Sequence, residues 1–221
     1  MPVSRPLFVT LEGIEGCGKT TQLSRLSAFL TRAGVAHEVT REPGGTPAGE
    51  DIRRILLTPR DPALTPLVDL LLYGAARAQH LQQVIEPALA AGKTVLCDRF
   101  LDATAAYQGF ASGLSLDIIN ALHDLPGLDR RPDLTLLLDL PVATGLARAR
   151  ARQASDGDVL TRFEEATLRF HDKVRQGYLE LARQEPSRFA VIDAAGSSEE
   201  VFERLRAPLA RRLGLREGNS G

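Results

Sequence analysis

The sequence lacks most of the features that mark secreted, membrane-spanning or nucleic-acid-binding proteins. It has only two cysteines, Cys17 and Cys97, too few for a disulfide framework or a four-cysteine zinc site. No stretch of about 18 apolar residues occurs, and residues 1–6 lack the apolar core of a secretion signal. The net charge of −1 gives no general attraction to nucleic acid or to anionic membranes. We therefore expect a cytoplasmic protein with neither nucleic acid nor membrane among its partners.

The bulk composition is that of a single globular domain. Of the 221 residues, 43% are hydrophobic and 25% are charged, which is ordinary for a chain with a buried core. The length suits one domain with at most a small subdomain. We expect this domain to span residues 1–213 and the tail, residues 214–221, to be frayed.

Short apolar runs alternate with longer helical patterns along the chain. The runs expected to form strands are residues 7–11, 35–40, 94–97, 134–138 and 189–192. Their alternation with helices predicts an α/β fold, a doubly wound five-stranded parallel sheet with helices on both faces. Amphipathic helices are predicted over 164–183 and 199–212. In such sheets ligands gather at the carboxyl ends of the strands, where the motifs below fall.

The strongest motif follows the first predicted strand and is typical of a phosphate-binding loop (P-loop). Residues 13–20 match G-x-x-x-x-G-K-[ST], in which backbone N–H groups surround polyphosphate. The backbone can close around an anion only where side chains are absent and unusual φ values cost little, which explains the glycines. The following helix points its positive end at the phosphates. The predicted nucleotide-binding residues are Gly13, Ile14, Glu15, Gly16, Cys17, Gly18, Lys19, Thr20 and Thr21.

Two clusters near the second predicted strand each admit a functional and a structural interpretation. The tight loop at residues 41–46 begins with Arg41 and Glu42, which form either part of a site or a solvated ion pair. Arg53 and Arg54 follow on the next helix, where a solvated helix face is the more common explanation. Both interpretations stay open from the residues alone.

Tyr73 and Arg77 are four residues apart in a predicted helix and so share one face. An aromatic ring that stacks on a base, next to a guanidinium that reads its carbonyl edge, would make a base pocket. Taken alone, however, the pattern favours a core tyrosine and a surface arginine.

Asp98 and Arg99 end the third predicted strand. A carboxylate beside a P-loop can hold Mg²⁺ through water, and a guanidinium can bind phosphate in a bidentate fork. The structural alternative is a buried Asp–Arg pair.

Farther along, Arg148 and Arg152 share one face of a polar, arginine-rich segment, residues 148–162. We interpret this segment as a mobile lid, although such runs are usually solvated basic faces.

In this order the segments resemble the thymidylate kinase family of P-loop nucleoside monophosphate kinases, over about residues 7–205. The P-loop alone would indicate only the superfamily. The specific stretches are Arg-Glu-Pro-Gly-Gly-Thr at 41–46, Asp-Arg-Phe at 98–100 and Ala-Tyr-Gln-Gly at 106–109. The resemblance implies Mg²⁺-dependent phosphoryl transfer from ATP to dTMP, giving dTDP and ADP. It also implies a homodimer formed through apolar helices.

The resemblance assigns a role to each matching residue. Lys19 would bind the phosphates, while Thr20 and Asp98 would lie at the Mg²⁺ ion. Arg99 would hold the acceptor phosphate, and Arg77 would read the carbonyl edge of thymine. The other implied acceptor residues are Glu15 near the sugar 3′-hydroxyl, Arg41, Tyr73 stacked on thymine, Thr104, and Tyr107 with Gln108 at the deoxyribose and base.

The catalytic arginine of this family lies either in the P-loop or in the lid. Gly16 and Cys17 leave no arginine in this P-loop, so the chain resembles the lid-arginine type, and Arg152 matches that position. Arg148 would border the adenine. The implied catalytic set is thus Lys19, Arg99 and Arg152.

Two positions depart from the family pattern, since Tyr73 stands where relatives usually have phenylalanine and Ala103 where a serine is common. Two alternatives for the function also stay open. One is another nucleoside monophosphate kinase, and the other is a nucleotide-binding regulatory module without catalysis. A GTP switch protein is disfavoured because no asparagine begins an Asn-Lys-x-Asp motif.

Overall fold

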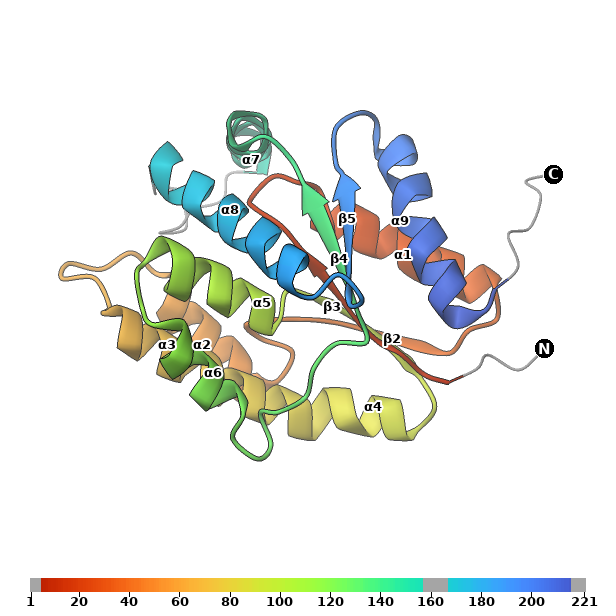
Figure 1. Ribbon diagram of the computed structural model, residues 1–221, viewed down its shortest axis with the longest axis horizontal. Coiled ribbons are helices and arrows are strands. Elements are labelled where there is room, and N and C mark those ends of the chain that lie inside the picture. The colour runs from red at the N-terminus through yellow and green to blue at the C-terminus, as the bar shows by residue number, and fades with distance from the viewer. Residues whose placement is uncertain (1–4, 157–166, 216–221) are drawn as a thin grey trace.

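The computed structural model of the protein describes residues 5–156 and 167–215, and for 152–156 it describes the backbone alone. Five parallel strands form its centre in the order β2-β3-β1-β4-β5 (Figure 1). Their bounds are β1 Phe8–Glu12, β2 His37–Arg41, β3 Thr94–Asp98, β4 Leu134–Asp139 and β5 Phe189–Asp193. The chain winds to one side of β1 through β2 and β3, and to the other through β4 and β5. The carboxyl end of β1 therefore lies at a topological switch point, where such sheets bind ligands. The predicted fold class is confirmed.

Several predicted boundaries were wrong by one to three residues. The second strand begins at His37 rather than at residue 35, because the Val35 N–H donates to the carbonyl of Leu30 and closes the preceding helix. Thr167, predicted to be helical, is instead an N-cap whose side chain accepts from the Phe170 N–H. Residues 164–166 of that predicted helix lie outside the described residues. All five strands extend one residue past their predicted ends, so the sheet also includes Glu12, Arg41, Asp98, Asp139 and Asp193.

Helices cover both faces of the sheet (Figure 1). On one face α1 (Lys19–Arg32) packs against α9 (Ser198–Leu213). The other face carries two π-helical turns and three helices, namely η1 (Leu81–Ile85), α4 (Glu86–Ala90), α5 (Leu101–Thr104), η2 (Ala105–Ala111) and α8 (Leu168–Gln184). Helix α8 lies directly against η2, and both lie beside the carboxyl end of β1.

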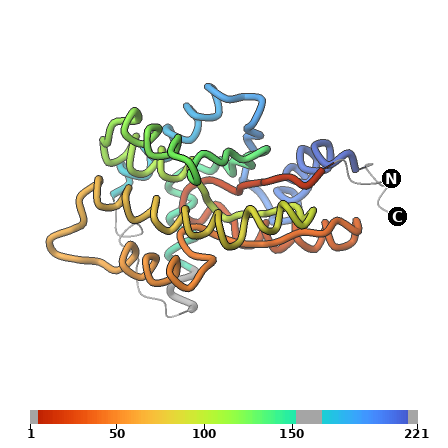
Figure 2. Tube along the Cα trace, turned by 90° about the horizontal axis from the view of Figure 1, so that it is seen from below, coloured from red at the N-terminus to blue at the C-terminus, as the bar shows by residue number. Residues whose placement is uncertain are grey.

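The remaining helices lie away from the centre of the sheet. Helix α2 (Pro47–Leu57) packs on α3 (Pro66–His80), which in turn packs on α6 (Leu116–His123). Helix α7 (Val142–Asp156) follows β4. The start of β1 and the end of α9 lie at one end of the molecule, and the α2–α3 connection lies at the other (Figure 2). Across residues 5–156 and 167–215, no helix is long and apolar enough to cross a membrane.

Alternation along β1 decides which of its side chains reach the site. Val9 and Leu11 belong to the core cluster that includes Leu26 and Leu205, on the α1–α9 side. Phe8 points to the opposite face, where it packs edge-on against Phe100 with ring centroids 4.8 Å apart. Because side chains alternate, Glu12 shares the face of Phe8. It is fully buried at the end of the strand, toward α5 and α8.

Candidate active site

The P-loop connects β1 to α1, and its glycines are required by both conformation and space. Gly13 and Gly16 have φ values of 139° and 71°. A Cβ on Gly16 would lie 1.9 Å from the carbonyl oxygen of Gly145 in α7, so the loop and that helix touch through bare backbone. Gly18 has a φ of 100°, but a Cβ there would meet nothing within 4 Å, so its requirement is conformational only.

Lys19 begins α1, and its ammonium folds back over the loop. The Nζ atom donates to the carbonyl oxygens of Gly13 at 3.2 Å and Ile14 at 3.1 Å, and the side chain is buried. The next residues, Thr20 and Thr21, are exposed in the first turn of α1. This arrangement presents a cation, a hydroxyl and a helix N-terminus on one loop, the set of donors that polyphosphate binding uses.

The residues predicted to hold Mg²⁺ fit that ion chemically. Asp98 ends β3, paired in register with Leu11 of β1, and its Oδ1 atom is buried with no hydrogen-bond partner among the described residues. A buried carboxylate oxygen without a donor suits a cation, and Mg²⁺ takes carboxylate, hydroxyl, water and phosphate oxygens. With the Thr20 hydroxyl in the first turn of α1, the donor set is all oxygen.

A cleft of about 190 Å³ opens beside the P-loop, at the carboxyl ends of β1, β2 and β3. All eight residues predicted to bind the acceptor nucleotide line it. They come from separate segments, namely the P-loop, the end of β2, α3, the end of β3, α5 and η2. Asp98 and Ala103 line it as well. The structure therefore brings these predicted residues together in one cleft.

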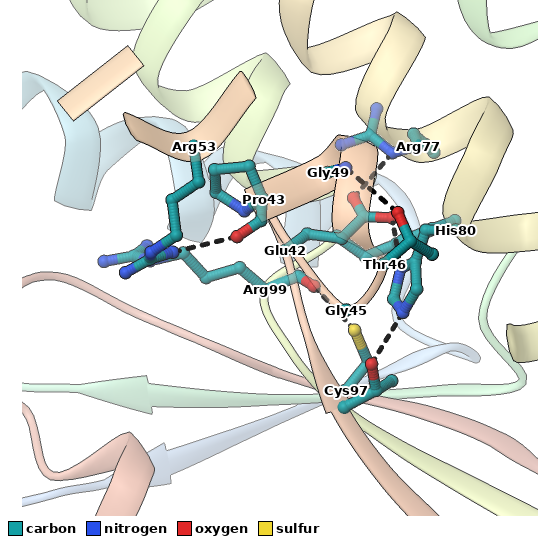
Figure 3. Close-up of polar contacts among 12 residues, drawn as sticks. Glu42, Pro43, Gly45, Thr46, Gly49, Arg53, Arg77, His80, Cys97 and Arg99 are labelled. Carbon is teal, nitrogen blue, oxygen red and sulfur yellow. Dashed lines mark hydrogen bonds and ion pairs between the residues drawn. The ribbon is translucent and has the colours of Figure 1, made fainter. Parts of the chain in front are cut away.

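Arg77 is the most buried charged residue of this cleft, with a relative exposure of 1%. Its Nε atom donates to Glu42 Oε2 at 2.8 Å (Figure 3). Its Nη2 atom donates to Thr104 Oγ1 at 3.1 Å. Its Nη1 atom lies 2.7 Å from His123 Nε2, and its guanidinium stacks 4.8 Å from the Phe100 ring centroid. The interpretation of Arg77 as a surface arginine was therefore wrong.

Two histidines complete this buried network. His80 Nδ1 lies 3.0 Å from Glu42 Oε1 (Figure 3). Its Nε2 lies 2.6 Å from Thr40 Oγ1. Burial, followed by the charge of Arg77, lowers the pKa of His123 to about 2. His123 is therefore neutral at physiological pH and can accept a hydrogen bond from Arg77. The solvated Arg41–Glu42 pair considered from sequence does not exist, because Glu42 turns inward.

Arg41 instead pairs with Glu50, with both oxygens 2.9 Å from Nη2. Arg53 was expected on a solvated helix face, but it lines the cleft and donates from Nη1 to the Pro43 carbonyl oxygen at 2.9 Å (Figure 3). Burial, with Arg41 as the next cause, lowers the pKa of Arg53. Arg54 does lie on the exposed face, paired with Asp51.

Arg99 lies between the cleft and the P-loop. Its Nη2 atom donates to Glu15 Oε1 at 3.0 Å and to Tyr107 Oη at 3.1 Å. Its Nη1 atom donates to the Gly13 carbonyl oxygen at 2.9 Å and to Tyr178 Oη at 3.0 Å. Its backbone φ is 67°, a left-handed conformation that a non-glycine residue adopts only when its surroundings impose it. The Asp98–Arg99 ion pair considered from sequence is replaced by these contacts.

Glu15 is held as a carboxylate in the wall of the cleft. Tyr107 Oη lies 2.7 Å and 2.8 Å from its two oxygens. His171 Nδ1 of α8 lies 3.2 Å from Oε2, at an angle that does not make a hydrogen bond. Burial alone would raise the pKa of Glu15, but His171 and Arg99 outweigh it and hold that pKa well below its usual range.

Glu12 and Tyr178 lie behind Arg99, outside the lining of the cleft, and the sequence did not reveal them. Glu12 Oε1 accepts from the Phe100 N–H at 2.7 Å, and Oε2 accepts from Tyr178 Oη at 2.8 Å. Burial, then the charge of Asp102, raises the pKa of Glu12 to about 8. The only sequence signal was an acidic residue directly after an apolar strand. Tyr178 gave none, because one tyrosine in an amphipathic helix is ordinary.

The segment predicted to be a lid is only partly described. Arg148, in α7, is exposed and donates from Nη1 to the Ala194 carbonyl oxygen at 3.4 Å. It thus contacts the loop after β5. Of the predicted lid, the side chain of Arg152 and residues 157–162 lie outside the described part of the chain. Residues 216–221 of the predicted tail lie outside it as well.

Comparison with known proteins agrees with this geometry. The sequence model of the thymidylate kinase family matches residues 11–205. A thymidylate kinase of Syntrophotalea carbinolica is 54% identical over 212 residues, which cover 96% of this chain and 98% of the relative. One of Desulfosudis oleivorans is 53% identical over 207 residues, 93% of this chain and 97% of the relative. A crystal structure of thymidylate kinase from Ehrlichia chaffeensis superposes with a TM-score of 0.72 at 32% identity, covering 93% of this chain and 99% of that one. The chain therefore belongs to the thymidylate kinase family.

Proposed function

We infer that the protein transfers the γ-phosphoryl group of ATP to dTMP, giving ADP and dTDP. The observation that carries this inference is the position of Arg99, which lines the acceptor cleft and also donates to the Gly13 carbonyl of the P-loop. One residue thus joins a polyphosphate loop to a cleft lined by all the residues expected to bind the acceptor nucleotide. Phosphoryl transfer needs two phosphates in line, and this geometry supports it.

The chain's own residues supply positioning and charge. The attacking oxygen belongs to the dTMP phosphate, which is ionised at neutral pH, so no general base is required. Lys19 binds the donor phosphates and Arg99 the acceptor phosphate, and together they bring the two phosphates into line. Thr20 and Asp98 would hold Mg²⁺, which when bound neutralises phosphate oxygens. Arg152 would add a positive charge to the transferring group.

Recognition of the base falls to Arg77, with Tyr73 stacked on the ring. The Arg77 guanidinium is fixed by Glu42, Thr104 and His123 and so is held ready for a carbonyl edge. A rigid donor rejects a base that leaves it unpaired more strongly than a mobile one does. Glu15 and Tyr107 would receive the sugar, and Gln108 the base.

The lid, residues 148–162, belongs to this proposal as part of one kinase domain over residues 1–213. Its arginines would exclude water and contact ATP, with Arg148 at the adenine. We place the reaction in the cytoplasm, where the buried thiols of Cys17 and Cys97 remain reduced.

We further propose a homodimer through α2, α3 and α6. These neighbouring helices expose Ile55, Leu67, Leu71 and Ile118, which are 39–55% accessible. Large apolar side chains gathered on packed helices favour a protein partner, and a second copy is the partner that the family resemblance implies. Sedimentation velocity of the wild type and Leu71→Asp tests this. A dimer that Leu71→Asp dissociates supports the proposal, and a monomeric wild type contradicts it.

The activity is tested with a panel of monophosphates, namely dTMP, dUMP, dCMP, AMP and GMP, each with ATP and Mg²⁺. ADP release is followed by a coupled assay. Fastest turnover with dTMP supports the proposal. Faster turnover with AMP or GMP would instead indicate another nucleoside monophosphate kinase, and ATP binding without ADP release would indicate a regulatory module.

A further inference from the structure

Tyr178 lies behind Arg99 on the side away from solvent, with a relative exposure of 1%. Its hydroxyl accepts from Arg99 Nη1 at 3.0 Å and donates to Glu12 Oε2 at 2.8 Å. We propose that Tyr178 is a positioning residue for Arg99 and that Glu12 is the anchor that fixes it. This inference rests on the proposed function, in which Arg99 binds the acceptor phosphate.

Glu12 is connected to Arg99 at both ends of that residue. Its Oε1 atom receives the N–H of Phe100, the peptide group directly after Arg99. Its Oε2 atom reaches the Arg99 guanidinium through the Tyr178 hydroxyl. One buried carboxyl group therefore restrains the backbone and the side-chain tip of the same arginine.

Arg99 needs such restraint because its conformation is unfavourable. A non-glycine residue at a φ of 67° is unfavourable relative to ordinary backbone, so neighbouring contacts must hold it there. The Arg99 N–H donates to the Leu11 carbonyl oxygen at 3.0 Å, and its own carbonyl accepts from Cys97 Sγ at 3.0 Å. These two contacts fix the backbone on the β1 and β3 sides. Glu12 supplies the restraint on the following peptide.

The guanidinium is held by two tyrosines, one on each terminal nitrogen. Tyr107, already expected at the sugar, takes Nη2, while Tyr178 takes Nη1. Their rings lie edge-on at 78° with centroids 6.4 Å apart, so the two hydroxyls flank Arg99 as a rigid pair. Burial, with Glu12 as the next cause, raises the pKa of Tyr178, and its hydroxyl thus retains the proton that it donates to Glu12.

The test is a double-mutant cycle on dTMP affinity, measured by calorimetry without ATP. Tyr178→Phe removes the hydroxyl and keeps the ring in the core, and Arg99→Met removes the guanidinium. We expect Tyr178→Phe to weaken dTMP binding roughly tenfold, the effect of losing one charge-assisted hydrogen bond. In the Arg99→Met background the same change should have no further effect, because Tyr178 acts through Arg99. ATP affinity should stay within about twofold of the wild type.

Thr10→Val is the matched control. It also removes a buried hydroxyl from this region, two residues from Glu12, but its partner is Thr135 and it does not contact Arg99. It should lower thermal stability without changing dTMP affinity.

Two results would overturn the inference while leaving the proposed function in place. Either Tyr178→Phe binds dTMP as tightly as the wild type, or its loss of affinity persists in full when Arg99 is absent. Wild-type protein that does not bind dTMP would contradict the proposed function itself, and the positioning role with it.

Discussion

The buried carboxyl of Glu12 should make the stability of the protein depend on pH in an unusual direction. Its pKa is raised by burial, and next by Asp102, from 4.5 to about 8. Between these values the folded protein binds a proton that the unfolded chain has lost. The stabilisation is therefore fully present below pH 4.5 and is lost as pH rises toward 8.

The magnitude follows from the width of that window. One pH unit corresponds to 1.36 kcal/mol for one proton, so Glu12 should lose about 3 kcal/mol of stabilisation between pH 5 and pH 7. His123 acts in the opposite sense, because burial and Arg77 lower its pKa to about 2. Its contribution is lost as pH falls below about 6.5, by roughly 2 kcal/mol at pH 5. The two trends nearly cancel in the wild type.

The Glu12→Gln variant separates the pH dependence of Glu12 from that of His123. The amide keeps the shape of the carboxyl group and can still accept from the Phe100 N–H, but it cannot titrate. The free energy of unfolding is measured by urea titration of both proteins at pH 5, 6 and 7. From pH 5 to pH 7, the free energy of unfolding of the variant should rise by about 3 kcal/mol relative to that of the wild type. This corresponds to roughly 6–12 °C in melting temperature. Glu203→Gln, on an exposed part of α9, is the matched control and should run parallel to the wild type. If the Glu12→Gln curve also ran parallel, Glu12 would be an ordinary ionised carboxylate and the reasoning would be refuted.

Three further predictions concern the site. Arg152→Ala should reduce turnover roughly 10³–10⁵-fold with little change in dTMP affinity, and near-normal turnover would remove Arg152 from the mechanism. Arg77→Lys keeps a charge beside Glu42 but loses the planar fork, so the preference for dTMP over dCMP should narrow by roughly 10- to 150-fold, for a loss of ~1.5–3 kcal/mol. An unchanged ratio in competition assays would exclude Arg77 as the base reader. Gly16→Ala should lower the melting temperature much more than Gly18→Ala, because only the former puts a Cβ against the Gly145 carbonyl. Equal decreases in melting temperature would show that the left-handed backbone alone requires glycine at these two positions.

The fold and the segments that line the cleft were predictable because they depend on local signals. Glycines that require positive φ, a lysine at a helix start and polar residues at strand ends are visible in the sequence without knowledge of tertiary contacts. The ends of the strands were less predictable. Glu12 and Asp98 are polar residues at the ends of apolar runs, and the pattern alone places such residues in loops.

Burial and pairing of charges could not be predicted in the same way. Arg77 looked exposed because it follows an apolar stretch of helix, and nothing nearby in the sequence could neutralise it. Its partner Glu42 lies 35 residues earlier, in the loop after β2, and points inward while its neighbour Arg41 points out to Glu50. A side chain's environment is set by which loop the fold places against it. Tyr178 was missed for the same reason, since its partners lie 79 and 166 residues away.

Packing on both sides of the P-loop holds Arg99 and helix α7 at fixed distances from the loop. On one side of the P-loop, Gly13 receives the Arg99 guanidinium, which α8 holds through Tyr178. On the other side, Gly16 touches Gly145 of α7 through bare backbone, closer than any side chain would allow. Arg148 follows Gly145 by three residues, a spacing that places it on the same side of α7. The loop is thus the common reference against which both Arg99 and helix α7 are placed. Catalysis by alignment of two phosphates depends on such a shared reference more than on any one contact.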